Sequence, residues 1–213
     1  MKNKLEITLT SMIVLVFFCC QGRAKEENIN SEFSDYLNLN RVQDKYLIDT
    51  QETHLMWKGS SLKGSHSGYV YISKGELVIE NSNLVGGSVE IDMKTIQDGG
   101  HRNDNNLIIH LKSPDFFDVK KFPISKMKIT EVTSISEGNK KITGDLTIKG
   151  ITHPVTFPAK IEIKDSIVKM EAGLAIDRTK WDVRYNSGKF YDNLADRVIS
   201  DSIVFQIKII AKT

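Results

Sequence analysis

Apolar and polar residues alternate along most of the chain beyond Tyr46. Strict alternation places one face of a strand against an apolar interior and the other face in water, which is typical of antiparallel sheet. Four series show the pattern most clearly: Val89, Ile91 and Met93; Ile142, Leu146 and Ile148, with Gly144 at an apolar position; Val168, Met170, Ala172, Leu174 and Ile176; and Ile203, Phe205, Ile207 and Ile209.

Turn-forming residues separate these series, at 73–75, 81–83, 137–139 and 164–166. Short strands with such spacing predict an all-β meander, sandwich or barrel. We count about eight strands, the number at which a closed antiparallel sheet can hold one small ligand inside. Closure would also remove the exposed edges of the sheet.

The segment Ser113-Pro-Asp-Phe-Phe-Asp118 breaks the alternation. Ser113 is suited to cap a helix, Pro114 to occupy its first position, and an acid to follow in the first turn. The sequence therefore predicts a short helix over 113–118, with Asp115 and Asp118 near its positive end. Phe116 and Phe117 would turn towards the apolar interior.

The N-terminus has the pattern of an export signal. Lys2 and Lys4 precede an apolar run over residues 12–20, which is shorter than the roughly 20 residues that span a bilayer. Residues 1–24 are therefore predicted to direct export, and the protein is expected in the periplasm or on the outer membrane or cell surface as a lipoprotein.

Two ways of processing this signal remain open. Gly22 and Ala24 form the small-x-small pattern that precedes cleavage, whereas lipidation of Cys20 would tether the protein to a membrane. Residues 25–45 are polar, with few apolar side chains, and are predicted to form a tether. The folded domain is predicted over 46–213.

Composition narrows the classes of function. The 213 residues are 40% hydrophobic and 26% charged, with a formal net charge of +2, which is too small and too scattered for a nucleic-acid-binding face. Both cysteines, Cys19 and Cys20, lie in the first tenth of the chain. Disulfides, thiolate metal sites and cysteine catalysis are therefore not expected in the folded body.

No catalytic or metal-binding pattern stands out. Serines occur in no Gly-x-Ser-x-Gly elbow, and Gly86-Gly87-Ser88 leads into a strand, which predicts a turn or bulge. The histidines are dispersed, without ligand spacing, so neither a metal nor a cofactor is predicted. They are His54, His66, His101, His110 and His153.

An ordered set of motifs resembles the YceI-like family of exported polyisoprenoid-binding proteins. The resemblance covers roughly Tyr46 to Ala211. The motifs are Trp57-Lys-Gly59, His66-Ser-Gly68, Gly87-Ser-Val-Glu-Ile-Asp92, His110 to Asp118 with Phe122-Pro123, Gly144 to Pro154, Ile176-Asp-Arg178, Trp181 to Tyr185 and Val198 to Asp201. The resemblance implies an extended, lipocalin-like antiparallel barrel with one or two short helices. It also implies an elongated apolar cavity for an isoprenoid or another long-chain amphiphile, and no catalytic activity is general to the family.

The apolar faces then become candidates for the cavity wall. From the residues alone these side chains could equally fill a solid core, and the resemblance favours a cavity. The cavity candidates are Val89, Ile91, Met93, Phe116, Phe117, Leu146, Ile148, Leu174, Ile176, Trp181, Phe205 and Ile207.

Arg178 and Arg184 allow two interpretations. They could hold the phosphate of a ligand headgroup, or they could pair with Asp177 and Asp182 while Trp181 packs against the barrel wall. The second interpretation is favoured, because ion pairs at strand ends are common.

The leading hypothesis is an exported, non-enzymatic protein that binds a polyisoprenoid, an isoprenoid quinone or a similar amphiphile in a barrel cavity. The alternative is a surface lipoprotein with a filled barrel that acts as a structural or stress-related interaction module. Expected partners are the long-chain lipid and, through Cys20, a membrane. A homodimer is compatible with this type of protein, and no residue pattern requires one.

Overall fold

The computed structural model describes residues 43–99 and 105–213. This part of the chain is built almost entirely of antiparallel strands, together with one α-helix and two short 3-10 helices. The strands are β1 (Asp44–Ile48), β2 (His54–Ser61), β3 (Gly64–Glu80), β4 (Asn83–Asp98), β5 (Ile124–Ser136), β6 (Asn139–Ile148), β7 (Ile151–Lys164), β8 (Ile167–Asp177) and β9 (Ser202–Lys212). The helices are α2 (Asn105–Lys112), η1 (Arg178–Trp181) and η2 (Ala195–Arg197).

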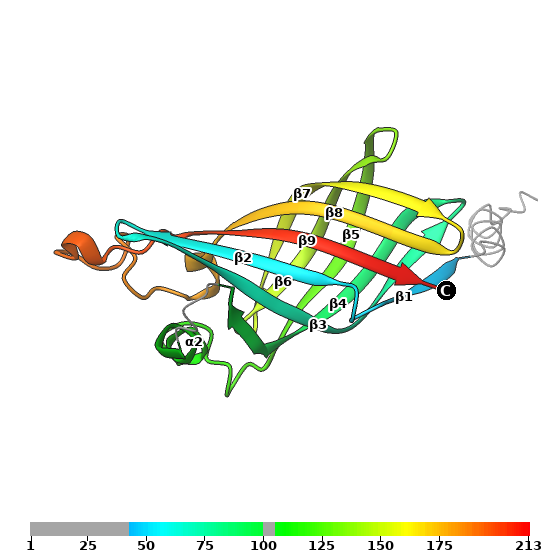
Figure 1. Ribbon diagram of the computed structural model, residues 1–213. Helices are drawn as coiled ribbons and strands as arrows, with labels where there is room; N and C mark the ends of the chain where they lie inside the picture. Colours follow the sequence, from blue (N-terminus) through cyan, green and yellow to red (C-terminus); the bar gives the residue numbers. More distant parts are fainter. Residues whose placement is uncertain (1–42, 100–104) are drawn as a thin grey trace, which may run out of the picture. The chain divides into compact units, whose positions relative to one another are not determined.

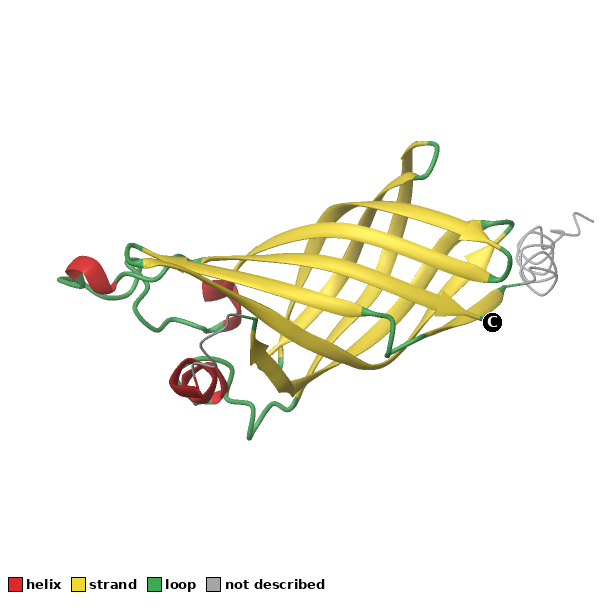
Figure 2. Cartoon of the chain, in the orientation of Figure 1, coloured by secondary structure: helices red, strands yellow, loops and turns green. Residues whose placement is uncertain are grey.

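The strands form one closed barrel (Figures 1 and 2). Neighbours along the sheet are β3, β2, β9, β8, β7, β6, β5 and β4, and the pairing of β3 with β4 closes the ring. Closure satisfies the backbone hydrogen bonds of strands that would otherwise be sheet edges. The predicted all-β antiparallel barrel of about eight strands is therefore confirmed.

The ninth strand does not add a position to the ring. β1 pairs with the last part of β3 through Asp44–Leu47 and with the end of β9 through Leu47 and Ile48. β2 lies between the earlier parts of the same two strands. β1 and β2 therefore share one strand position of the barrel, interrupted by the turn at 49–53.

Tight turns connect the long strands where the sequence places turn residues, with one exception. Asn81–Ser82 and Asp165–Ser166 have positive φ angles at both positions, the geometry of hairpin turns that follow the twist of the strands. The predicted turn at 73–75 is wrong, because β3 runs through it with a register shift between Ile72 and Lys74.

Gly75 has another role in β3. A Cβ there would lie 2.7 Å from the Ser88 carbonyl oxygen and 2.7 Å from the Ile48 side chain. The glycine therefore permits close approach of neighbouring groups, which explains a turn-like residue inside a strand. The sequence predicts a turn or bulge at Gly86–Gly87, and the structure has a bulge beside them: Val78 pairs with Gly86 and Ile79 with Leu84, so Val85 is the extra residue of β4.

The helix near the phenylalanine pair lies earlier than the sequence predicts. α2 ends at Lys112, and residues 113–118 form a turn, so the predicted helix at 113–118 is wrong. Ser113 caps the preceding helix, because its Oγ donates to the His110 carbonyl at 2.7 Å. Pro114 disfavours helical backbone at the residue before it, which places the boundary here.

The turn at 113–118 is held by the last carbonyls of α2. The Phe117 N–H donates to the Leu111 carbonyl at 3.2 Å and the Val119 N–H to the Lys112 carbonyl at 3.0 Å. Asp118 has a φ of 45°, and its N–H donates to the Ser113 carbonyl. Asp115 and Asp118 therefore lie in a helix-ending turn and not at the positive end of a helix.

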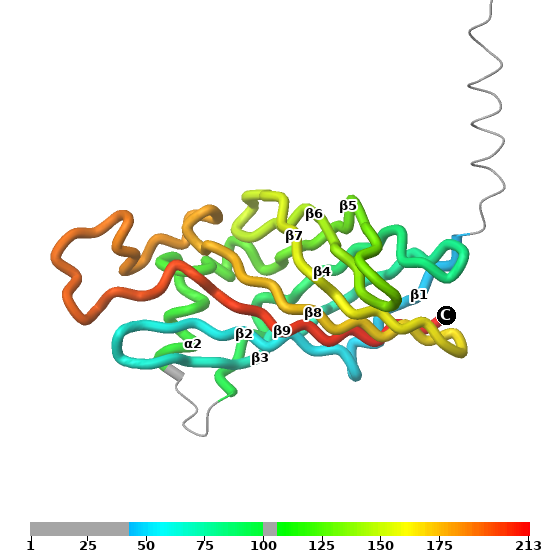
Figure 3. The backbone as a smooth tube through the Cα atoms, turned by 90° about the horizontal axis from the view of Figure 1, so that it is seen from above, coloured from blue at the N-terminus to red at the C-terminus, as the bar shows by residue number. Residues whose placement is uncertain are grey.

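The barrel has two different ends. At the helix end lie the β2–β3 hairpin, α2 and the segment 178–201 between β8 and β9 (Figures 1 and 3). Three contacts join this segment to the hairpin: Ser61 bridges Ile199, the Ser200 N–H donates to the Ser60 carbonyl at 2.9 Å, and Lys63 pairs with Asp196 at 2.9 Å. At the turn end lie β1, the turns at 81–82 and 165–166, and the end of β9.

The predicted export signal over residues 1–24 lies outside the described residues, as does the predicted tether up to residue 42. Among the described residues, the first strand is β1, and the predicted domain boundary at residue 46 lies within it. Within residues 43–99 and 105–213, no helix combines the length and the apolar character needed to cross a bilayer.

Candidate functional site: an apolar cavity inside the barrel

A cavity of about 330 Å³ lies inside the barrel. Its wall is mainly apolar and is drawn from β2 to β9, from α2 and from the turn that follows it. This size falls at the lower end of the roughly 300–1,000 Å³ that is usual for small-molecule sites. The interior is therefore not filled throughout, and a filled barrel, which the alternative hypothesis required, is not what the structure has.

Most residues predicted for the cavity wall lie there. The alternating strand pattern brings them together, because inward-facing positions of neighbouring strands meet across the barrel. The predicted residues found in the wall are Val89, Ile91, Met93, Phe116, Phe117, Leu146, Ile148, Leu174, Phe205 and Ile207. Phe116 and Phe117 reach it from the turn after α2 and not from a helix of their own. Contact of these residues with a ligand stays a prediction.

Two predicted residues do not line the cavity. Ile176 is buried in the core as the penultimate residue of β8, two positions before η1 begins. Trp181 lies in η1, where its Nε1 donates to the Leu146 carbonyl at 3.0 Å and its ring meets the edge of His153. A buried indole N–H needs an acceptor, and the acceptor here is a strand carbonyl, so Trp181 packs on the barrel wall.

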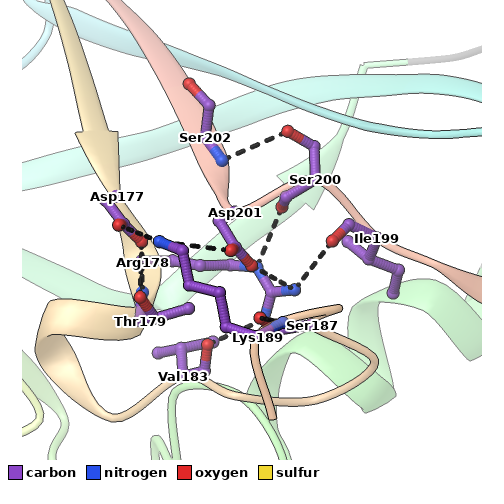
Figure 4. Close-up of polar contacts among 10 residues, drawn as sticks. All are labelled: Asp177, Arg178, Thr179, Val183, Ser187, Lys189, Ile199, Ser200, Asp201 and Ser202. Carbon is purple, nitrogen blue, oxygen red and sulfur yellow. Dashed lines mark hydrogen bonds and ion pairs between the residues drawn. The ribbon is translucent and has the colours of Figure 1, made fainter. Parts of the chain in front are cut away.

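Arg178 reaches the cavity wall, but its guanidinium is held by the protein itself (Figure 4). Nε donates to the Ser200 carbonyl at 3.0 Å, Nη1 to the Val183 carbonyl at 2.7 Å and Nη2 to the Ile199 carbonyl at 3.1 Å. Nη2 also lies 3.5 Å from Oδ1 of Asp201. Arg178 therefore holds the segment 178–201 against the end of the barrel.

The electrostatics agree with this structural role. Burial lowers the pKa of Arg178, and the charges of Asp201 and Asp177 act in the opposite direction. The side chain is 1% exposed, and its charge is compensated by these carboxylates and three carbonyl dipoles. Arg178 thus pairs with an aspartate, as that interpretation expects, but the aspartate is Asp201 and not Asp177, whose carboxylate accepts hydrogen bonds from Thr179 and Lys189.

Arg184 lies away from the cavity wall. Its Nε is 2.7 Å from Oδ1 of Asp182, and its guanidinium lies over the Phe190 ring at 4.7 Å. The side chain is 54% exposed. Arg184 and Arg178 therefore do not converge on one headgroup.

Sequence reasoning missed a polar section of the wall at the helix end. Its members lie on the β2–β3 hairpin and the segment 178–201, and they are Ser60, Ser61, His66 and Ser200. Among the described residues of the wall, Arg178 and His66 are the ionisable ones. The motif that contains His66 marked this place in the chain, but no sequence pattern connects it with Ser200.

Sequence reasoning also missed much of the apolar wall. Some of them already belong to the predicted alternating series, as Met170 does in β8 and Ile209 in β9, but were not among the cavity candidates. Others lie in strands that the four series do not contain. The further apolar wall residues are Leu55, Trp57, Val70, Ile72, Leu77, Ile96, Leu107, Leu111, Met127, Ile129, Phe157, Met170, Ile199, Ile203 and Ile209.

Within residues 43–99 and 105–213, no three His, Cys, Asp or Glu side chains gather in the way that a metal site requires. His153 contacts the Lys180 carbonyl, and His110 packs between Phe116 and Tyr185. His101 and both cysteines lie outside the described residues.

A closed antiparallel barrel with an apolar internal cavity, covered at one end by a helix and a long segment, defines the structural class of this chain. The sequence model of the YceI-like domain matches residues 46–211. The chain belongs to the YceI-like domain family.

Comparisons with individual proteins agree with this family. A UPF0312 protein of Pseudomonas putida strain W619 is 33% identical over 123 residues, which cover 54% of this chain and 60% of that protein. The match thus spans less than two thirds of this relative's length.

Solved structures share the fold. BcnA of Burkholderia cenocepacia superposes with a TM-score of 0.65 at 18% identity, covering 78% of this chain and 99% of BcnA. A polyisoprenoid binding domain from Saccharophagus degradans gives a TM-score of 0.59 at 9% identity, covering 79% of this chain and 98% of that domain. These likenesses show the barrel architecture.

Proposed function

We propose that this protein is an exported, non-enzymatic binding protein that holds a long apolar chain in its barrel cavity. The cavity of about 330 Å³, with its mainly apolar wall, is the observation that carries the proposal. The ligand class is a polyisoprenoid, an isoprenoid quinone or a similar amphiphile. Membership of the YceI-like family and the shared fold of a polyisoprenoid binding domain support this class.

Burial of the ligand's apolar chain supplies the affinity in this proposal. Each methylene removed from water contributes about 0.8 kcal/mol, so several isoprene units offset the cost of immobilising the chain. Such a site needs few polar contacts. Its selectivity then depends on the length and width of the cavity.

The wall can adapt to chains of different bulk. Met93, Met127 and Met170 line the cavity. Methionine has three rotatable bonds and a polarisable sulfur, so its side chain changes rotamer at low cost. These residues are expected to move aside for a chain that exceeds the volume of the empty cavity.

Native mass spectrometry of the full-length protein, purified without detergent, tests the proposal. The expected spectrum shows an added mass that disappears after extraction with organic solvent, and the extract contains a long-chain lipid. An apo mass that persists when a prenyl hydrocarbon or a prenylated quinone is added in excess would contradict the proposal.

Export and tethering form a separate part of the proposal, supported by the apolar run at residues 12–20. Cleavage after Ala24 and lipidation of Cys20 predict different N-termini for the mature protein. Cell fractionation of the wild type and of Cys20→Ala distinguishes them, because only lipidation makes membrane association depend on Cys20. Recovery of the full-length chain from the cytoplasm would contradict export.

A further inference from the structure

The chain has two tryptophans, and their indole N–H groups differ. The Nε1 of Trp181 donates to the Leu146 carbonyl at 3.0 Å. The Nε1 of Trp57 is buried and has no hydrogen-bond partner among residues 43–99 and 105–213. Trp57 is 8% exposed and lines the cavity. An unpaired buried donor costs free energy in the empty protein, and a ligand that supplies an acceptor removes this cost.

The structure around Trp57 holds its ring in place. Trp57 lies in β2, directly opposite Gly68 in β3 and Phe205 in β9. A Cβ at Gly68 would lie 2.7 Å from Cζ2 and 2.9 Å from Cε2 of the indole. The ring therefore lies close against the glycine backbone, which leaves little freedom to Nε1, the atom bonded to Cε2.

Trp57 also lies next to the polar section of the cavity wall. Ser60 and Ser61 follow it along β2, and His66 faces Gly59 across the hairpin. The apolar wall continues from Trp57 in the opposite direction, through Leu55. Trp57 therefore lies where an apolar ligand inside the barrel would end and its polar headgroup would begin.

The charges at this end do not favour an anionic headgroup. Arg178 already donates to three carbonyls of the segment 178–201. Beside it, Oδ1 of Asp201 is buried without a hydrogen bond. A pyrophosphate would meet a compensated cation and a nearby carboxylate, whereas a neutral oxygen would need only a donor.

We propose that Trp57 Nε1–H is the headgroup donor of the cavity, and that it selects a chain ending in a neutral acceptor oxygen, such as a quinone carbonyl, over a pyrophosphate. This inference rests on the proposed function. It assigns a binding role to Trp57 and a neutral chemical class to the ligand.

Three probes with the same prenyl chain and different ends test the assignment: a prenylated benzoquinone, the prenyl hydrocarbon and the prenyl pyrophosphate. The quinone is expected to bind the wild type roughly fivefold more tightly than the hydrocarbon, as for one neutral hydrogen bond. Trp57→Phe keeps an aromatic ring and removes the N–H, so it is expected to abolish this difference. Hydrocarbon affinity should change by less than about twofold, because the chain contacts remain.

Trp181→Phe is the matched control, because Trp181 does not line the cavity and its indole N–H is bonded to the backbone carbonyl of Leu146. It should leave the preference for quinone over hydrocarbon unchanged. Equal losses for quinone and hydrocarbon in Trp57→Phe would overturn the assignment, and so would tightest binding of the pyrophosphate.

Nuclear magnetic resonance provides a readout that needs no folded Trp57 variant. The wild type has two indole N–H resonances, which Trp181→Phe assigns. The quinone should move the Trp57 resonance downfield and leave that of Trp181 in place, and the hydrocarbon should not produce this downfield shift. A Trp57 resonance that does not respond to the quinone overturns the inference, while hydrocarbon binding would still support the proposed function. If no probe binds, both fail.

Discussion

The two halves of the barrel interior are built from the same strands but are packed differently. At the turn end, Ile142, Val168 and Ala211 are completely buried, and none of them lines the cavity. In the middle of β4, Val89 and Ile91 are only partly buried and face the cavity. Part of the turn end is therefore filled core, whereas the cavity occupies much of the remaining interior.

This difference shows that stability and binding are separated along the barrel axis. A filled core gains from every contact, because protein interiors pack as densely as organic crystals. A cavity wall gives up some of these contacts, and a ligand can restore them. We therefore expect substitutions at the turn end to change mainly the free energy of unfolding, and substitutions in the cavity wall to change mainly the affinity for a chain.

The largest expected effect comes from removing side-chain volume at the turn end. Ile142→Ala deletes a fully buried side chain and should lower the free energy of unfolding by about 2–5 kcal/mol. Ile91→Ala should cost less, on the order of 1 kcal/mol, because its side chain already faces a space. Chemical denaturation of the apo protein measures both values.

This pair of variants tests whether the cavity wall is packed less tightly than the turn end. Equal losses for Ile142→Ala and Ile91→Ala would mean that the cavity wall is packed as tightly as the turn end. The cavity would then not exist in solution. Repeating the measurement with bound prenyl hydrocarbon should raise the stability of both variants, because the ligand binds only the folded state.

Adding volume inside the cavity should have an intermediate effect. Val89→Phe places a larger ring in the cavity wall and is expected to weaken binding of a prenyl hydrocarbon by roughly tenfold or more, at little cost in stability. The same substitution at Val168 should destabilise the fold by about 1–3 kcal/mol, because the turn end is full. Fluorescence displacement and chemical denaturation give the two readouts.

Val85→Phe is the control for this experiment. Val85 lies on the same strand as Val89 but is exposed and absent from the cavity wall. It should leave chain affinity unchanged. Loss of binding in Val85→Phe equal to that in Val89→Phe would show that the assay reports on a general property of β4 and not on cavity volume.

The sequence predicts the barrel more completely than the site because strand alternation is a local signal. Period-two series such as the one from Val168 to Ile176 establish both the strands and their inward faces. The helix was misplaced because Ser113 and Pro114 are compatible with either end of a helix. The hydrogen bonds from the Ser113 Oγ and N–H to the His110 carbonyl show that Ser113 ends α2.

The difference between packed and hollow parts cannot be derived from the alternation itself. Ile142 and Ile91 occupy equivalent positions in their series, yet one is fully buried and the other lines the cavity. Whether such a side chain packs against other side chains or faces the cavity depends on the register and curvature of the whole barrel. The polar contacts are also nonlocal, since Arg178 donates to the Ile199 carbonyl and Trp57 lies opposite Gly68.

The smallest expected effect concerns electrostatics, which differs little between the two ends. At the helix end, Lys189 Nζ lies 2.6 Å from Asp177 and 3.4 Å from Asp201. At the turn end, Lys212 Nζ lies 2.7 Å from Asp49 and 2.7 Å from Glu52. Both clusters are partly exposed, so each ion pair is expected to contribute between about 0 and 1 kcal/mol.

Acid should weaken the helix-end cluster in a defined range. Burial raises the pKa of Asp177, but hydrogen bonds from Lys189 and Thr179 outweigh it and lower the pKa from 3.8 to about 2. Because the folded-state pKa is the lower one, the stabilisation is complete above the unfolded value and is lost as the pH falls from about 4 to about 2. Asp177→Asn should reduce the dependence of unfolding free energy on pH in this range, by less than about 1 kcal/mol.

Lys189→Met tests whether the ion pair causes this dependence. It removes the strongest hydrogen-bond donor to Asp177 and should flatten the acid range in a similar way, and the double variant should change little beyond either single one. If the effects of the two substitutions on the unfolding free energy are additive in the double variant, the pH dependence comes from other carboxylates. Neither substitution should alter affinity for a prenyl hydrocarbon, because Asp177 and Lys189 lie outside the cavity wall. The wild type could instead lose affinity for the prenyl hydrocarbon in acid, with no such loss in either variant. This result would show that the helix-end cluster controls access to the cavity. Folding stability and ligand binding would then be coupled at this end of the barrel.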